Sequence, residues 1–171
     1  MPVLAQDAAQ RERNEWNFTK YDAHGRVVAM GLFTSTQTAT TLQSEVHADA
    51  QWESRSSGGD YTSNTFPKTG GIKHTVNYYD NYDFPDNPFP KSSYPETSDH
   101  VQGLATGSMV KIQDTDIWLY TVICYDEKGR VKYTVNEQLA ADDTKVKDET
   151  RFEYDFVGRM IESKRSISTT P

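Results

Sequence analysis

Tyr125-Asp126-Glu127-Lys128-Gly129-Arg130-Val131 is the stretch of sequence that decides the fold, because its pattern occurs three times. The same pattern, Y-D-x-x-G-R-[VM], stands at Tyr21–Val27 and at Tyr154–Met160. At ordinary residue frequencies, a chance match to five specified positions out of seven is rare in a chain of this length, and three matches indicate an internal repeat. The three copies are therefore repeats of one structural unit.

The chemistry of the repeat predicts a β-hairpin. The aspartate side chain can accept hydrogen bonds from the amides of a type I turn, and the glycine can adopt a positive φ without steric cost. Together they form a three-residue hairpin loop closed by a bulge. In that register the aspartate faces the arginine, and the tyrosine faces the valine or methionine. The residues to which we assign this structural role are Tyr21, Asp22, Gly25, Arg26, Tyr125, Asp126, Gly129, Arg130, Tyr154, Asp155, Gly158 and Arg159.

The segments around the repeats predict a mainly β protein. Aromatic residues make up 12% of the chain, although hydrophobic residues make up only 35%, and aromatic side chains suit a pleated, half-buried surface. Ile117–Tyr125 is apolar throughout and predicts a strand buried on both faces, whereas Arg151–Tyr154 alternates and predicts a hairpin with one wet face. Further strands are expected at Ile72–Asp80 and Leu104–Ile112. The predicted fold is an antiparallel sheet of these hairpins with one short α-helix.

Two segments interrupt the β pattern. Thr40–Glu53 places Leu42, Val46 and Ala50 four residues apart, which predicts one short amphipathic helix. Tyr78–Pro95 mixes prolines with aromatic residues and predicts a long irregular loop. No linker with a shift in composition divides the chain, so residues 1–171 are expected to form one domain.

Composition and charge exclude several classes of function. The net charge is −7 and the pI is about 5.0, which argues against a nucleic-acid partner because phosphate binding normally needs a basic surface. Mean hydropathy is −0.78, and no apolar run is long enough for a membrane span. The first residues have no basic segment followed by an apolar one, so we see no signal peptide.

The three repeats resemble the YD repeat of the RHS family of large bacterial surface and secreted proteins, which includes polymorphic toxins. A looser likeness spans Trp16–Ser166. The resemblance implies successive hairpins in a spiralling sheet that closes into a shell and encloses a C-terminal toxic polypeptide. It also implies a secreted or cell-surface location. Its implied partners are other repeats of the same shell or the enclosed C-terminal polypeptide.

The chain differs from whole members of that family. It carries three clear motifs rather than dozens, the segment with the Asp-Pro self-cleavage region has no counterpart, and no toxin domain follows. We therefore expect a non-catalytic structural segment of a larger shell, with no autoproteolysis or toxicity assigned to any residue. A sheet cut from a larger one exposes its edges, so we also expect some self-association into homo-oligomers.

The residues offer little for catalysis or metal binding. The four histidines are scattered without ligand spacing, so no metal site or other cofactor is expected. Asp80, Asp83 and Asp86 are a weak alternative for calcium, since the EF-hand glycine and terminal glutamate are missing. Cys124 lies in an apolar segment and is expected to be a buried, inert thiol. We assign no catalytic residue and expect no enzyme.

The alternative function is a carbohydrate-binding surface module that uses the aromatic loop Tyr78–Tyr94. Aromatic rings beside carboxylates can stack on sugars, provided that the rings are exposed. The residues of this alternative site are Tyr78, Tyr79, Tyr82 and Phe84. The competing interpretation is that these rings pack against the sheet and anchor the loop.

Overall fold

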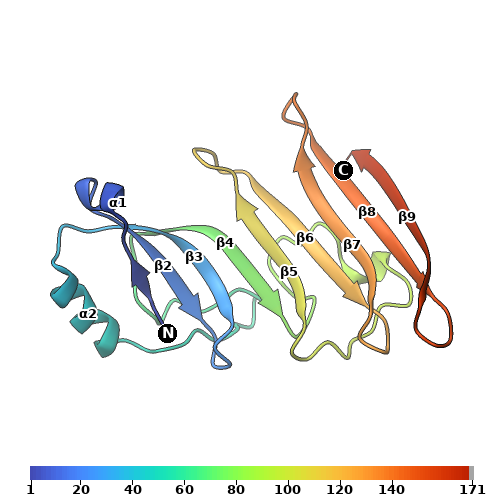
Figure 1. Cartoon of the computed structure of the whole chain (residues 1–171), viewed down its shortest axis with the longest axis horizontal. Coiled ribbons are helices and arrows are strands. Elements are labelled where there is room, and N and C mark those ends of the chain that lie inside the picture. The colour runs from blue at the N-terminus through green and yellow to red at the C-terminus, as the bar shows by residue number, and fades with distance from the viewer. Residues whose placement is uncertain (170–171) are drawn as a thin grey trace. The chain divides into compact units, whose positions relative to one another are not determined.

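The chain is mainly β, as predicted, and its strands run antiparallel to their neighbours (Figure 1). The computed structural model describes residues 1–169. The elements, in chain order, are β1 (Leu4–Ala5), α1 (Ala8–Glu12), β2 (Glu15–Tyr21), β3 (Val27–Thr34), α2 (Ala39–Ala48), β4 (Gly71–Tyr79), the 3₁₀ turn η1 (Lys91–Ser93), β5 (Ala105–Lys111), β6 (Trp118–Tyr125), β7 (Val131–Leu139), β8 (Lys145–Tyr154) and β9 (Met160–Thr169).

The chain divides into two compact units, Met1–Asn77 and the part that begins at Tyr78. In the first unit, β1, β2, β3 and β4 pair in chain order. In the second unit, β5 to β9 pair in chain order. The sequence predicted one domain, because no shift in composition marks this boundary.

The predicted hairpin register is confirmed at all three repeats. Tyr21 pairs with Val27, Tyr125 with Val131, and Tyr154 with Met160, each next to a bulge. The three turn glycines have φ values of 77°, 73° and 90°. In each turn the aspartate also bonds the arginine across the loop, at 2.7 to 2.8 Å from its Nε. The turn therefore sets the register of each of these hairpins through contacts that are local in the sequence.

We expect the substitution Gly129→Val to lower the free energy of unfolding by more than about 1 kcal/mol. Gly129 has a φ of +73° with open space around it, so the penalty comes from the backbone conformation and not from a clash. Urea unfolding measures the loss, and Lys128→Val in the same exposed turn is the matched control because Lys128 does not need a positive φ. Equal stability of the two variants would contradict the role assigned to the glycine.

The main helix is shorter than predicted. Helix α2 begins after Thr38, whose hydroxyl accepts a hydrogen bond from the amide of Thr41, and it buries Leu42. It ends at Ala48, not at Glu53, because the following residues pair with other segments: Ala50 bridges to Thr65. A second, five-residue helix, α1, was not predicted; it starts at a capping box between Asp7 and Gln10.

Strand β6 was predicted to be buried on both faces, but the structure buries mainly one of them. Tyr120, Val122 and Cys124 are buried, whereas Thr121 and Ile123 between them are only half-buried. One face of the strand therefore carries the core of the second unit and the other face does not. The loop after Tyr79 covers the buried face, and in Figure 1 it lies behind β6 and β7.

No helix among residues 1–169 is long and apolar enough to cross a membrane.

Candidate functional site: the last hairpin

Strand β9 is exposed along its whole described length. Each of its ten residues is exposed, and β8 is the one strand with which it pairs among the described residues. Its exposed hydrophobic side chains include Met160, Ile161 and Ile167, which are 57%, 66% and 63% exposed. The sequence predicted one wet face for this hairpin, but the last strand is open to solvent on both. A long open edge with apolar side chains is typical of a surface that pairs with another strand.

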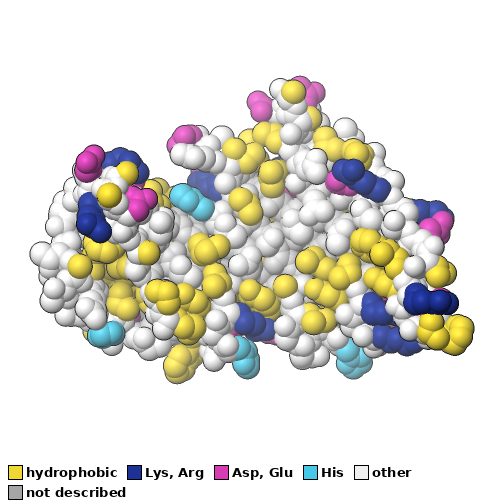
Figure 2. Space-filling view, in the orientation of Figure 1, with side chains coloured by type: hydrophobic (Ala, Val, Ile, Leu, Met, Phe, Trp, Pro, Cys, Tyr) yellow, Lys and Arg dark blue, Asp and Glu magenta, His cyan; other side chains and the backbone are white. Residues whose placement is uncertain are grey.

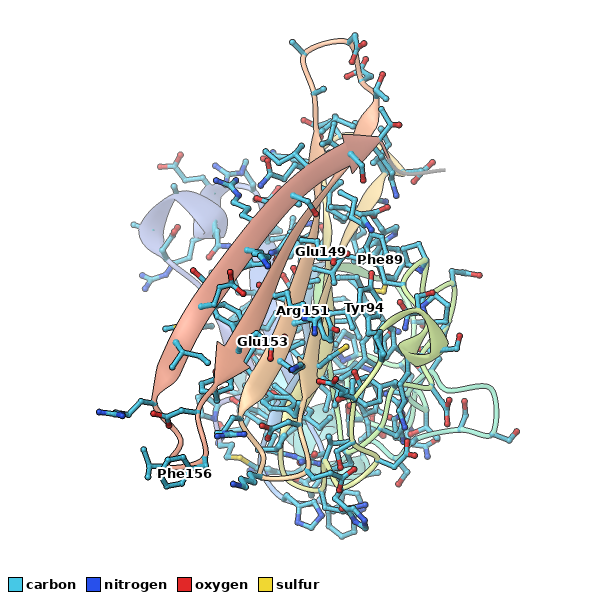
Figure 3. The ribbon with its side chains drawn as sticks, turned by 90° about the vertical axis from the view of Figure 1, so that its right-hand side faces the viewer. Phe89, Tyr94, Glu149, Arg151, Glu153 and Phe156 are labelled. Atoms are coloured by element: carbon cyan, nitrogen blue, oxygen red, sulfur yellow. The ribbon has the colours of Figure 1, made fainter. Side chains whose placement is uncertain are left out.

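The turn that leads into β9 adds two further apolar side chains to this surface. Phe156 is 90% exposed and Val157 is 59% exposed. The corresponding positions of the second repeat hold Glu127 and Lys128. Figure 3 shows Phe156 at the tip of the turn, away from the other labelled side chains. Figure 2 shows hydrophobic and basic side chains side by side over this end of the second unit.

One face of the last hairpin carries an array of charges. Glu153 of β8 stands opposite Glu162 of β9, and Arg151 stands opposite Lys164. The ion pairs therefore run along each strand: Arg151 lies 2.6 Å from Glu153, and Lys164 lies 3.2 Å from Glu162. These four side chains line a hollow of about 140 Å³. Glu162 and Lys164 therefore each face a like charge on β8, and like charges directly across a strand pair are unfavourable.

Lys132 of β7 joins this array to the covering loop. Its ammonium group is 2.8 Å from Glu153 and 2.6 Å from Glu96, and the residue is 6% exposed. Burial would lower the pKa of Lys132, but its hydrogen bonds to the two carboxylates raise that pKa above its ordinary value. The hydrogen bond from Lys132 in turn lowers the pKa of Glu153. Figure 3 shows Glu149, Arg151 and Glu153 along β8, with Tyr94 and Phe89 of the loop nearby.

The aromatic loop is placed differently from what sugar binding needs. Tyr78, Tyr82 and Phe84 are 1%, 8% and 6% exposed, and Tyr79 is half-buried. The rings of Tyr78 and Phe84 stack with their centroids 4.6 Å apart, and the hydroxyl of Tyr82 accepts a hydrogen bond from the backbone N–H of Tyr125. Burial raises the pKa of Tyr82. Because a stacking site needs exposed ring faces, this placement argues against the carbohydrate-binding alternative.

The remaining candidate residues are those of the calcium alternative and Cys124. Among residues 1–169, no group of three or more histidine, cysteine, aspartate and glutamate side chains is placed to hold a metal ion. In the proposed calcium alternative, the carboxylate of Asp80 accepts a hydrogen bond from the backbone N–H of Gly103. Cys124 is fully buried, and burial raises the pKa of its thiol to about 11. This thiol is therefore protonated near neutral pH.

Sequence reasoning missed the charge array, although a signal for it exists. Charged residues stand at both odd and even positions of two segments, Lys145–Glu153 and Glu162–Arg165. Both faces of each strand therefore carry charges, which an apolar core face would not show. The contact between Lys132 and Glu96 joins two segments that no local pattern connects.

No family model, curated protein or solved structure matches this chain.

Proposed function

We propose that this chain is a non-catalytic structural segment of a β-sheet wall of the RHS/YD-repeat kind, which encloses a C-terminal cargo or toxin in its parent protein. The observation that carries the proposal is β9, a ten-residue edge strand whose residues are all exposed. Such an edge presents a row of backbone N–H and C=O groups that another strand can pair with. The three hairpins with one common turn support the same role.

In this proposal the function is mechanical. Each YD turn holds its two strands in one register through the aspartate–arginine contact. A wall can then grow by the addition of strands at the β9 edge, and a closed wall shields what it encloses. A secreted or cell-surface location belongs to the same proposal because it comes from the family resemblance. The absence of catalysis belongs to it because the sequence led us to assign no catalytic residue.

The experiment is hydrogen–deuterium exchange at the amides of β9, compared between this chain at low concentration and the longer polypeptide that contains it. We expect exchange in β9 to be fast in the chain alone and slow in the longer polypeptide, because a following strand covers the edge there. The amides of β6, which has strands on both sides, are the internal reference and should not change. Equal exchange of β9 in the two samples would overturn the proposal.

A further inference from the structure

Two charges on β9, those of Glu162 and Lys164, are self-complementary, although each of them faces a like charge on β8. Glu162 faces Glu153, and Lys164 faces Arg151. On the open side of β9, a partner strand with a lysine opposite Glu162 and a glutamate opposite Lys164 would give each of them an opposite charge at its facing position. An antiparallel copy of β9 itself meets this requirement, because Glu162 and Lys164 lie symmetrically about Ser163.

We infer that β9 pairs with β9 of a second copy of this chain, antiparallel, with Ser163 facing Ser163 on the two-fold axis. This inference rests on the proposed function, in which β9 is an open edge. It names the strand that pairs with β9 when the chain is studied by itself. A two-fold contact of this kind uses the same surface on both copies and closes as a dimer. The pairing brings Glu162 opposite Lys164 twice.

Charge selects this register over its neighbours. Facing residues of an antiparallel pair lie on the same face of the sheet. Side chains alternate between the faces along a strand, so each residue can face only a residue an even number of positions away in the other copy. The two-fold axis therefore passes between two copies of the same residue. An axis at Glu162 would set two glutamates against each other, and an axis at Lys164 would set two lysines against each other. An axis at Arg165 would likewise bring two arginines together. Of the axis positions from residue 162 to residue 165, Ser163 alone avoids these repulsions, and it forms two opposite-charge pairs.

The opposite face of the pair is also compatible with this register. With Ser163 on the axis, Ile161 of each copy faces Arg165 of the other. Arg165 already bonds Asp148 through its Nε at 2.7 Å, so its charge is satisfied within its own chain. Its aliphatic stem is then available to cover Ile161, which is 66% exposed in the chain on its own.

Charge reversal tests the register. We expect sedimentation velocity to show a dimer for the unmodified chain, and a dimer dissociation constant raised at least about tenfold in Glu162→Lys and in Lys164→Glu, because each puts two like-charge pairs in place of two opposite ones. Mixing the two single variants restores pairing, since each then meets its complement. The double variant, with both charges exchanged, also dimerises. Glu127→Lys, the same charge change at an exposed turn position, is the matched control and leaves the dimer unchanged.

Cysteine cross-linking gives an independent measure of the register. Under mild oxidation, Ser163→Cys should form a disulfide-linked dimer, because residues facing each other across a strand pair lie within disulfide reach. Ser166→Cys is the control: in this register residue 166 faces residue 160, far from its own counterpart. The native Cys124 is fully buried and does not compete.

The outcomes separate this inference from the proposed function. A monomer at high concentration, cross-linking at position 166 in preference to 163, or single variants that dimerise as well as the unmodified chain would overturn the dimer. A monomer whose β9 is still protected in the longer polypeptide leaves the wall proposal standing. A dimer in this register together with unprotected β9 amides in the longer polypeptide supports the inference and contradicts the wall.

Discussion

The substitution Glu53→Gln is expected to lower the free energy of unfolding by about 3–5 kcal/mol, although it keeps the size and shape of the side chain. Glu53 is 1% exposed, and its carboxylate lies 2.9 Å from the ammonium group of Lys20. It also accepts hydrogen bonds from the hydroxyls of Thr62 and Thr65 and from the amides of Asn64 and Thr65. An amide side chain would turn its NH₂ group toward some of these donors and leave Lys20 without a counter-charge.

Urea unfolding with linear extrapolation measures this loss. Glu12→Gln is the matched control, because Glu12 is exposed and surface substitutions of this kind change stability by no more than about 0.5 kcal/mol. A Glu53→Gln variant as stable as this control would show that the buried ion pair does not stabilise the first unit.

The two partners of this ion pair should not be equivalent. Lys20 donates to Glu53 and to the carbonyl oxygen of Thr65, whereas Glu53 accepts from four other donors besides Lys20. When Lys20→Met removes the ammonium group, the carboxylate keeps those four hydrogen bonds. We therefore expect Lys20→Met to destabilise the protein less than Glu53→Gln does, and the reverse order would contradict this account of the network.

The same network makes stability depend on pH. Burial would raise the pKa of Glu53, but the hydrogen bonds from Thr62, Asn64, Thr65 and Lys20 lower it from 4.5 to about 2. Because the folded state holds the proton less tightly than the unfolded state does, this stabilisation is complete above about pH 4.5 and is lost as the pH falls toward 2. The shift corresponds to about 3 kcal/mol. Between pH 5 and pH 2 the unmodified chain should therefore lose more stability than Glu53→Gln does.

The hairpins could be predicted because their determinants lie within seven residues of one another. The aspartate, glycine and arginine of each repeat contact one another inside the turn, so the pattern contains the whole geometry. The pairing of Tyr125 with Val131 follows directly from it. The fold class was predicted for the same reason, since strands joined by such turns are antiparallel neighbours.

The features that sequence reasoning missed depend on contacts between distant segments. Helix α2 was expected to reach Glu53, but the side chain of Glu53 bonds Lys20, which is 33 positions away. This contact needs extended backbone where the local pattern favoured a helix. Likewise, alternation at Arg151–Tyr154 describes one strand of a hairpin and contains no information about whether anything covers β9.

Gly31→Ala is expected to lower the free energy of unfolding by about 3 kcal/mol, the upper part of the usual range for overpacking. A Cβ at Gly31 would overlap the carbonyl oxygen of Ile72 and lie 2.8 Å from Cε1 of Phe18. Gly31 stands at the bulge between β3 and β4, and a backbone oxygen cannot rotate aside, so the two strands would have to separate. Gly58→Ala is the matched control, because its added Cβ would come no closer than 3.9 Å to any other atom. Thermal and urea unfolding of both variants measure the difference, and equal stability would mean that β3 and β4 do not approach each other this closely.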